Sequence, residues 1–342
     1  MTSPEPSGGD SAVGAPRVAA IMPARDDATH IAAAIGSFLS QRHAGELAIA
    51  VGLAPSTDGT ARIVAEMAAA DPRITVADNP SGRTAAGLNA ALRAIDADVV
   101  VRVDAHCELP PGYVARAVET LGRTGAANVG GIQRAEGSTP YQRAVARAMT
   151  SRFGVGDSQF HFGGDEGPTD TVYLGVFDAA ALRAAGGFDE SLVRNQDYEL
   201  NWRLRQAGHQ VWFDPELAVR YRPRSTIGGL ARQYFQYGQW KREVLRRHPR
   251  SAKPRQLVAP LTLVGVLTGL IGAATGRRWM LLAPATYATA VAAAAAADSS
   301  SPEEAGRLAT VYPTMHMSWG AGFLVGPGSI DEPPDPARDG QH

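Results

Sequence analysis

The chain has 342 residues, 44% of them hydrophobic, and a formal net charge of −1. This length is enough for one large domain with a full hydrophobic core and a smaller appended segment. The near-neutral charge argues against a general nucleic-acid binder, and the single cysteine, Cys107, excludes an internal disulfide and a multi-cysteine metal site. We expect Cys107 to be a small, partly buried residue.

Both ends of the chain are predicted to lack fixed structure. Residues 1–16 are rich in Ser, Pro and Gly and contain no apolar signal-peptide core. We therefore expect a disordered tail over 1–16, and a second one over 327–342.

Strands and helices alternate in the pattern of residues 17–103. Apolar runs predict strands at 17–22, 47–53, 74–76 and 97–103. Helical patterns lie between them, at 31–41 after a Thr29 cap, at 61–70 and at 87–95. Such alternation is typical of an α/β fold with a mainly parallel sheet flanked by helices. Ligands collect at the carboxyl ends of parallel strands, so Arg25, Asp58 and Asp104, which each follow a strand, should share one edge.

The pattern loosens over residues 141–170, where Gly and aromatic residues are frequent. This segment is either a mobile loop beside an acceptor or a surface segment without strong periodicity. Beyond it the sequence predicts a strand at 171–177, helices at 178–185 and from Asn195 or Asp197 to 207, and strands at 211–213 and 218–221.

A basic amphipathic segment follows the last predicted strand. Apolar residues recur at three- and four-residue steps over 227–247, as on one face of a helix. Eleven Lys or Arg and one acid, Glu243, lie between Arg220 and Arg255. Aromatic anchors beside a basic face suit an interfacial helix on anionic lipid, although the basic residues could also be a solvated face. We expect residues 227–255 to form this interfacial helix and a linker.

Two long uncharged segments occupy the C-terminal part, at 256–275 and 279–297. A bilayer core of ~30 Å needs roughly 20 apolar helical residues, so both are long enough to span it. A third uncharged stretch, 311–325, contains His316 and two glycines and suits an interfacial or re-entrant piece. We expect membrane-associated hydrophobic helices over 256–326; the alternative is a pair of buried helices in a soluble domain.

Basic residues near these segments bear on their orientation. Arg250, Lys253 and Arg255 precede the first segment and favour a cytoplasmic start. Arg277 and Arg278, in the connection between the two segments, count against that orientation. We expect a protein of the cell membrane with its catalytic domain in the cytoplasm.

Two acidic clusters point to catalysis. Asp104 follows an apolar strand, where a carboxylate suits a divalent cation or a sugar phosphate. Asp197 and Glu199 lie at the start of a predicted helix, where a carboxylate suits a general base. Asp197 or Asn195 could instead simply cap that helix. Capping does not explain the cluster of two acids and an amide, so we favour an enzyme that moves a group off a metal-bound nucleotide.

Six motifs occur in a fixed order along the chain: MPARDD, STDGT, GLNAAL, RVDAH, GGFDE and RNQDYELNWRL. With them the chain resembles the inverting glycosyltransferases of family 2, which have the GT-A fold. Within that family it is most similar to bacterial exopolysaccharide glycosyltransferases of the succinoglycan ExoA type. The resemblance covers roughly residues 17–250 and implies a GT-A catalytic domain over 17–226.

The resemblance implies a donor site at the first two loops. Pro23, Ala24, Arg25 and Asp27 fall where the family borders the nucleotide base and ribose. Asp58 falls on the second nucleotide loop, or it is an Asx-turn residue at the helix start.

One departure from the family pattern concerns the same loops. Acids usually precede the STDGT turn, and this chain has Leu53 and Ala54 there, so the resemblance leaves the nucleotide open. Arg83 is placed to reach the diphosphate, or it is an exposed loop arginine.

Asp104, Ala105 and His106 occupy the place of the family's Asp-x-Asp element. The resemblance implies that Asp104 holds Mn²⁺ or Mg²⁺ beside the diphosphate. His106 replaces the second acid and is either a ligand, which favours Mn²⁺, or an ordinary loop histidine.

The resemblance also assigns acceptor chemistry. Asp197 matches the acid of the family's Glu-Asp pair and would be the catalytic base, with Gln196 in place of the first acid. Glu199 would orient the acceptor or face solvent. Trp240 lies near the place of a Gln-x-x-Arg-Trp element and would line the acceptor site, or it packs its helix on the core.

We therefore expect an inverting glycosyltransferase that moves a hexose from a nucleotide-diphosphate sugar, a UDP-hexose in the first instance, to a lipid-linked or polysaccharide acceptor. Membrane is an expected partner and nucleic acid is not. One rival hypothesis is a nucleotidyltransferase, which the missing Gly-rich basic signature near the first strand disfavours. Another is a non-catalytic sugar-nucleotide-binding protein, suggested by Leu53, Ala54 and His106.

Overall fold

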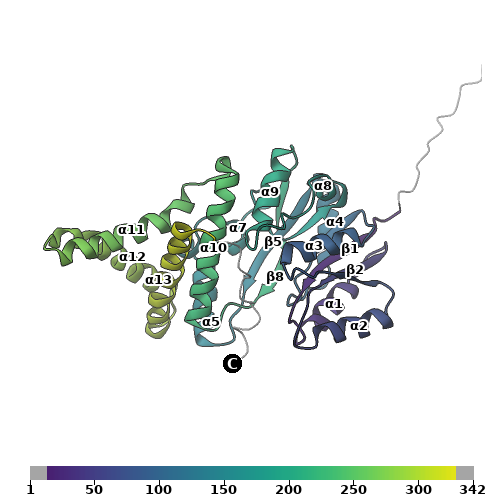
Figure 1. The fold of residues 1–342 in the computed structure, drawn as a ribbon, viewed down its shortest axis with the longest axis horizontal. Coiled ribbons are helices and arrows are strands. Elements are labelled where there is room, and N and C mark those ends of the chain that lie inside the picture. The colour runs from purple at the N-terminus through teal and green to yellow at the C-terminus, as the bar shows by residue number, and fades with distance from the viewer. Residues whose placement is uncertain (1–13, 329–342) are drawn as a thin grey trace, which may run out of the picture.

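A computed structural model describes residues 14–328. Most of the predicted tails at 1–16 and 327–342 therefore lie outside the described residues. Figure 1 shows an α/β body that carries an arm of long helices on one side.

The body is built on one eight-stranded sheet with the order β3-β2-β1-β4-β7-β5-β8-β6. The strand pairs β1–β2, β2–β3, β1–β4 and β5–β8 are parallel, whereas β7 runs antiparallel to both of its neighbours. The strands are β1 (Val18–Ala24), β2 (Leu47–Leu53), β3 (Ile74–Asp78), β4 (Val99–Arg102), β5 (Asn128–Ala135), β6 (Gly167–Pro168), β7 (Tyr173–Asp178) and β8 (Val211–Tyr221). The mainly parallel sheet confirms the α/β fold class predicted from the sequence.

Helices cover both faces of the sheet. One face packs on α1 (Ile31–Leu39), α2 (Thr60–Ala70) and α4 (Tyr113–Thr124). The other packs on α3 (Thr84–Arg93), α8 (Ala179–Ala184) and α9 (Gln196–Gln206). Side chains alternate between the two cores along β1, β2 and β4, as Ala20 and Ile21 do in β1.

Several boundaries differ from the sequence prediction. His30, not Thr29, is the N-cap residue of α1. The two predicted late strands form one strand, β8, whose register against β5 shifts between Gly130 and Ile132. A side chain at Gly131 would meet the backbone oxygens of Asp214 and Leu217, so glycine is required at this bulge.

The loosely patterned segment 141–170 contains three helices: α5 (Pro140–Met149), α6 (Arg152–Val155) and α7 (Gln159–Phe162). A capping box explains why α5 forms, because Thr139 accepts from the Gln142 backbone and Gln142 reaches back to Thr139. Buried residues of α5 join a separate helical core that is formed with three later helices.

That helical core is built on α10 (Ile227–Arg247) and α13 (Pro302–Val325). The two helices can pack closely because Gly238 and Gly322 have no side chain. An added Cβ at Gly238 would lie 2.0 Å from the Trp319 backbone oxygen, and one at Gly322 would lie 1.9 Å from the Phe235 backbone oxygen. The apolar face of α10 is therefore turned towards protein. The stretch 311–325 is the C-terminal part of α13, a continuous helix with buried residues.

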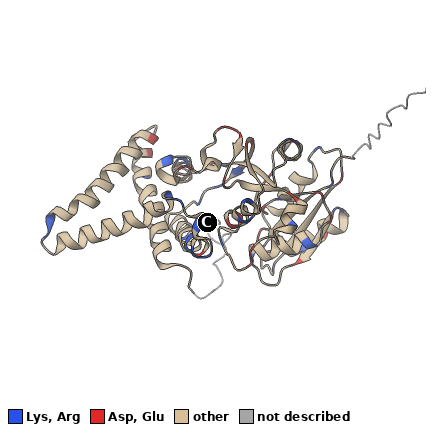
Figure 2. Ribbon diagram, turned by 90° about the horizontal axis from the view of Figure 1, so that it is seen from above, with Lys and Arg blue, Asp and Glu red and all other residues tan. Residues whose placement is uncertain are grey.

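The arm is a hairpin of α11 (Arg255–Ala274) and α12 (Leu282–Asp298), joined by a 3-10 turn (Arg278–Leu281). By length and composition, α11 and the segment Arg278–Asp298, which is the 3-10 turn continued by α12, are each long and apolar enough to cross a membrane. Ten of the fourteen large apolar residues that the described chain exposes lie between Leu257 and Leu282. Figure 2 shows this arm projecting from the body, with basic residues at its far turn. The two helices are therefore not buried within this chain.

Candidate functional site

The candidate site lies at the carboxyl edge of the parallel strands. Pro23 pairs with Gly52 and Ile21 pairs with Arg102, so β1, β2 and β4 end at the same edge. The loops after them touch, since the Ala28 backbone N–H donates to Asp58 at 2.9 Å and His106 Nδ1 lies 3.9 Å from Asp27. This is the arrangement expected for Asp58 and Asp104 from the alternation of strands and helices.

Arg102 links the two carboxylates that the sequence singles out. Its Nε and Nη2 donate to Asp104 Oδ1 at 3.1 and 3.0 Å, and its Nη1 donates to Asp197 Oδ1. Arg102 is only 6% exposed at the end of β4, and Asp197 is the second residue of α9. Asp104 and Asp197, more than ninety residues apart, thus meet at one guanidinium.

The charges around Arg102 shift the two acids in opposite directions. Burial favours neutral Asp104, but Arg102, followed by His106 and Arg194, outweighs it and lowers the pKa of Asp104. Burial raises the pKa of Asp197, and the charge of Asp104 adds to this against the pull of Arg102. The Asp197 side chain is 40% exposed, so a ligand can still reach its carboxyl group.

Asp104, His106 and Cys107 form a possible metal-binding group, with ligand atoms all within 4.8 Å of one another. Burial raises the pKa of the Cys107 thiol to about 12, so the thiol stays protonated and is a poor ligand. Burial lowers the pKa of His106, which leaves a neutral imidazole able to bind a metal. A carboxylate and an imidazole fit Mn²⁺, and the carboxylate also fits Mg²⁺.

Asp58 is occupied by hydrogen bonds between the first two loops. Its Oδ1 accepts from the Thr60 backbone at 3.0 Å and from the Thr60 hydroxyl at 2.6 Å, and its Oδ2 accepts from Ala28. Although burial acts the other way, these bonds lower the pKa of Asp58. This geometry is the Asx-turn alternative, and it fixes the loop in which Asp27 lies.

The other residues of the first loop differ in their exposure. Ala24 is 3% exposed and its side chain belongs to the hydrophobic core, not to the open surface of the site. Pro23 lies beside α3, where an added Cβ at Gly87 would be 3.3 Å away. The Arg25 guanidinium lies against Gly82 of the neighbouring loop.

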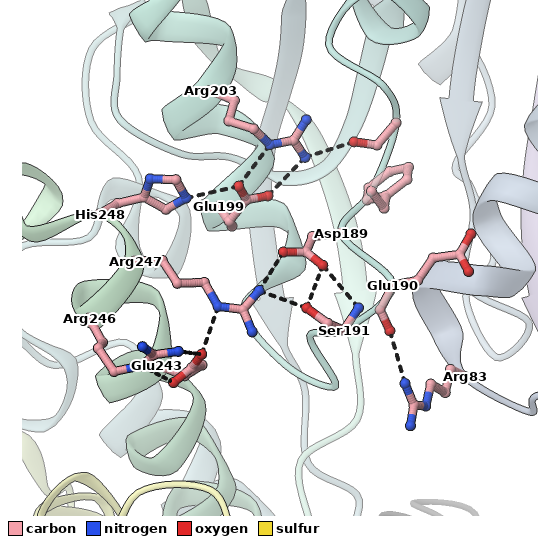
Figure 3. A network of polar contacts seen from close by, with 12 residues as sticks. Arg83, Asp189, Glu190, Ser191, Glu199, Arg203, Glu243, Arg246, Arg247 and His248 are labelled. Carbon is pink, nitrogen blue, oxygen red and sulfur yellow. Dashed lines mark hydrogen bonds and ion pairs between the residues drawn. The ribbon is translucent and has the colours of Figure 1, made fainter. Parts of the chain in front are cut away.

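Arg83 follows that loop and donates to the Glu190 oxygen at 3.4 Å (Figure 3). The contact connects the GGFDE segment to the loop between β3 and α3.

Glu199 faces away from this site. Its carboxylate accepts from Arg203 Nε at 2.7 Å and Nη2 at 2.8 Å and lies 3.1 Å from His248 Nε2 (Figure 3). The side chain is 2% exposed. Glu199 therefore holds α9 to the segment after α10, and the structure does not bring it to Asp104 and Asp197.

Trp240 is 8% exposed and packs in a small core with Leu192, Tyr198 and Val244. Tyr198 also lies under the ammonium group of Lys241, which is 3.1 Å from the ring centroid. Trp240 thus packs α10 against α9 next to Asp197, the packing role considered for it in the sequence.

Arg102 is the site residue that sequence reasoning missed. The signal was available, because an arginine two residues before an acid interrupts an otherwise apolar strand, and a buried charge needs a partner. Arg194 was missed as well; it lies three residues before Asp197, and its charge reaches Asp104.

Comparisons with known proteins agree with this architecture. Residues 16–237 match the model of a family described as glycosyltransferase like family 2. The succinoglycan biosynthesis protein ExoA of Rhizobium meliloti is 31% identical over 308 residues, which cover 89% of this chain and 92% of the relative.

Two solved structures share the fold at low sequence identity. The mannosyltransferase PcManGT from Pyrobaculum calidifontis, in complex with GDP-Man and Mn²⁺, aligns with a TM-score of 0.57 and 20% identity over 91% of this chain and 87% of that one. Residues 1–349 of TarS from S. aureus align with a TM-score of 0.50 and 14% identity over 90% of each chain.

Proposed function

Because the chain belongs to glycosyltransferase family 2, we propose that it transfers a sugar from a nucleotide-diphosphate donor to a glycan or lipid-linked acceptor with inversion at the anomeric carbon. The observation that carries this proposal is the meeting of Asp104 and Asp197 at Arg102, at the carboxyl edge of the parallel strands. An inverting transfer needs a base for the acceptor close to a binding place for the donor diphosphate, and this pair provides both.

The donor lies over the edge formed by the first two loops and Asp104. Asp104 and His106 are the residues that would hold Mn²⁺ or Mg²⁺. When bound, the cation neutralises the charge of the departing nucleoside diphosphate. Pro23, Arg25 and Asp27 border the nucleotide. Arg83, which follows the neighbouring loop, is the arginine proposed to approach the diphosphate.

Asp197 accepts the proton of the attacking acceptor hydroxyl. The acceptor oxygen forms a bond to the anomeric carbon while the bond from that carbon to the diphosphate breaks, and the nucleoside diphosphate leaves. The raised pKa of Asp197 strengthens it as a base, and the hydrogen bond from Arg102 stabilises its carboxylate form.

We propose a nucleotide-activated hexose as the donor, and a UDP-hexose in the first instance, as expected from the sequence. The similarity to ExoA supports an acceptor used in exopolysaccharide synthesis. The exposed apolar arm supports a membrane location, which would bring a lipid-linked acceptor to the site. The cytoplasm is where a nucleotide-sugar donor would meet the catalytic domain.

Replacing the proposed base tests this function. Asp197→Asn should reduce transfer by at least about 10²-fold, because an amide cannot take the proton, while binding of the nucleoside diphosphate stays intact. Transfer is measured as nucleoside diphosphate released from a panel of UDP- and GDP-sugars with a membrane lipid extract as acceptor. Undiminished turnover in this variant would remove Asp197 from the chemistry.

A further inference from the structure

Arg102 occupies the space between the proposed metal ligand and the proposed base. One guanidinium donates to Asp104 through two nitrogens and to Asp197 through the third. A guanidinium is a fixed positive charge that stays protonated at every physiological pH. The site therefore contains a permanent cation where an added divalent cation would also be attracted.

We propose that Arg102 is a positioning residue that keeps Asp197 out of the metal coordination shell and makes metal binding depend on the nucleotide. This inference rests on the proposed function, in which Asp104 holds the cation and Asp197 is the base.

Without Arg102 the site would present two unpaired carboxylates, from Asp104 and Asp197, beside the imidazole of His106. Two carboxylates and an imidazole are an ordinary ligand set for Mn²⁺. Asp197 would then be free to turn towards a cation held by Asp104 and His106, and a carboxylate bound to a cation is a weaker base. The guanidinium prevents this, because it pairs with both acids and occupies an oxygen of each.

The nucleotide changes the balance. A metal ion alone must compete with Arg102 for Asp104 and meets a positive charge about one ion-pair distance away. A metal ion that arrives with a diphosphate brings negative charge and oxygen ligands of its own. The wild-type protein should therefore bind Mn²⁺ alone weakly, and at least about tenfold more tightly when a nucleoside diphosphate is present.

The test is a titration with Mn²⁺ alone, followed by the electron paramagnetic resonance signal of the free ion. Arg102→Met should bind Mn²⁺ at least about tenfold more tightly than the wild type, because it removes the competing charge and frees two carboxylates. Adding Asp197→Asn to this variant should return the affinity towards the wild-type value. Arg102→Lys keeps the charge and should stay within about threefold of the wild type.

Two results would overturn the proposal: an Arg102→Met protein that binds Mn²⁺ no more tightly than the wild type, or a wild type whose Mn²⁺ affinity does not respond to UDP or GDP. Asp197→Asn in the otherwise unchanged chain gives a reading that does not depend on how Arg102 variants fold. It should leave the affinity for Mn²⁺ alone unchanged, and a clear loss would make Asp197 a metal ligand.

The proposed function is tested separately with Asp104→Ala. If this variant binds Mn²⁺ and nucleoside diphosphate as the wild type does, the metal site itself is wrong. If it loses them while Arg102→Met gains nothing, the metal site stands and only the role of Arg102 fails.

Discussion

At the scale of single residues, Asp197 and Glu199 show how a helix separates two neighbouring acids. They lie two positions apart on α9, which is about 200° of rotation, so they point to opposite sides of the helix. Asp197 bonds to Arg102, which also holds Asp104, whereas Glu199 is buried with Arg203 and His248. Their grouping in sequence was visible, but the side on which each would fall depended on how α9 packs.

Glu199 should therefore matter for stability. Glu199→Gln leaves Arg203 partly buried without its charged partner, and we expect the free energy of unfolding to fall by about 3–5 kcal/mol. Chemical denaturation measures the change. Glu66→Gln is the matched control, because it breaks an exposed i,i+4 pair with Arg62 and should cost at most about 0.5 kcal/mol. Equal effects of the two substitutions would show that the buried network adds no stability.

At the scale of elements, the sequence located the strands of the first half well, because each is a short apolar run between turn residues. Leu47–Leu53 is predicted and observed with the same limits. The structure adds α4 and β5, which the prediction did not contain, and α5, which lies in the loosely patterned segment. The buried face of α5 packs on α12 and α13, and such distant packing leaves no local pattern in the sequence.

The helix α10 carries an unusual group for a buried face, Lys241, which is 8% exposed. Burial lowers its pKa to about 7; Asp170 opposes this shift and Lys253 adds to it. In the unfolded chain the pKa is near 10.5, so between about pH 7 and 10.5 the unfolded state binds more protons. The free energy of unfolding should accordingly rise with pH as this group loses its proton.

Lys241→Met should remove that pH dependence. We expect the variant to be more stable than the wild type at pH 7, by about 1–4 kcal/mol, because no charge is left to bury. The difference should shrink towards pH 9. Thermal unfolding at several pH values measures it, with Lys253→Met, which removes a less buried ammonium that is paired with Asp170, as the comparison. A Lys241→Met protein no more stable than the wild type at pH 7 would mean that the Tyr198 ring fully compensates the burial.

At the scale of the whole molecule, the α11–α12 arm presents an exposed apolar surface that is separate from the candidate site. Apolar side chains cover its outside, and small residues bring its helices together: Gly269 packs on Pro284, and Gly272 packs on Met280. Both ends of the arm are tied to the body, through Arg255 to Asp170 and through Asp298 to Arg147. If the arm enters a membrane, its two base ends therefore lie on the same side.

We expect the arm to cross the bilayer twice, because about 20 helical residues span its ~30 Å core and the turn at Arg277 and Arg278 lies at the far end. In a Cys107→Ala background, Arg277→Cys should react with an impermeant maleimide added to intact cells. Glu66→Cys, on the catalytic body, should react only in inverted vesicles. Labelling of both positions from the same side would show that the arm does not cross.

The account depends on a division of labour between Asp104 in donor binding and Asp197 in chemistry. Calorimetric titration of UDP and GDP in the presence of Mn²⁺ separates the two most directly. Wild type and Asp197→Asn should bind with affinities within about twofold of each other, and Asp104→Ala should bind at least about tenfold more weakly, a difference that disappears when the metal is chelated. Equal binding by all three proteins would contradict the account.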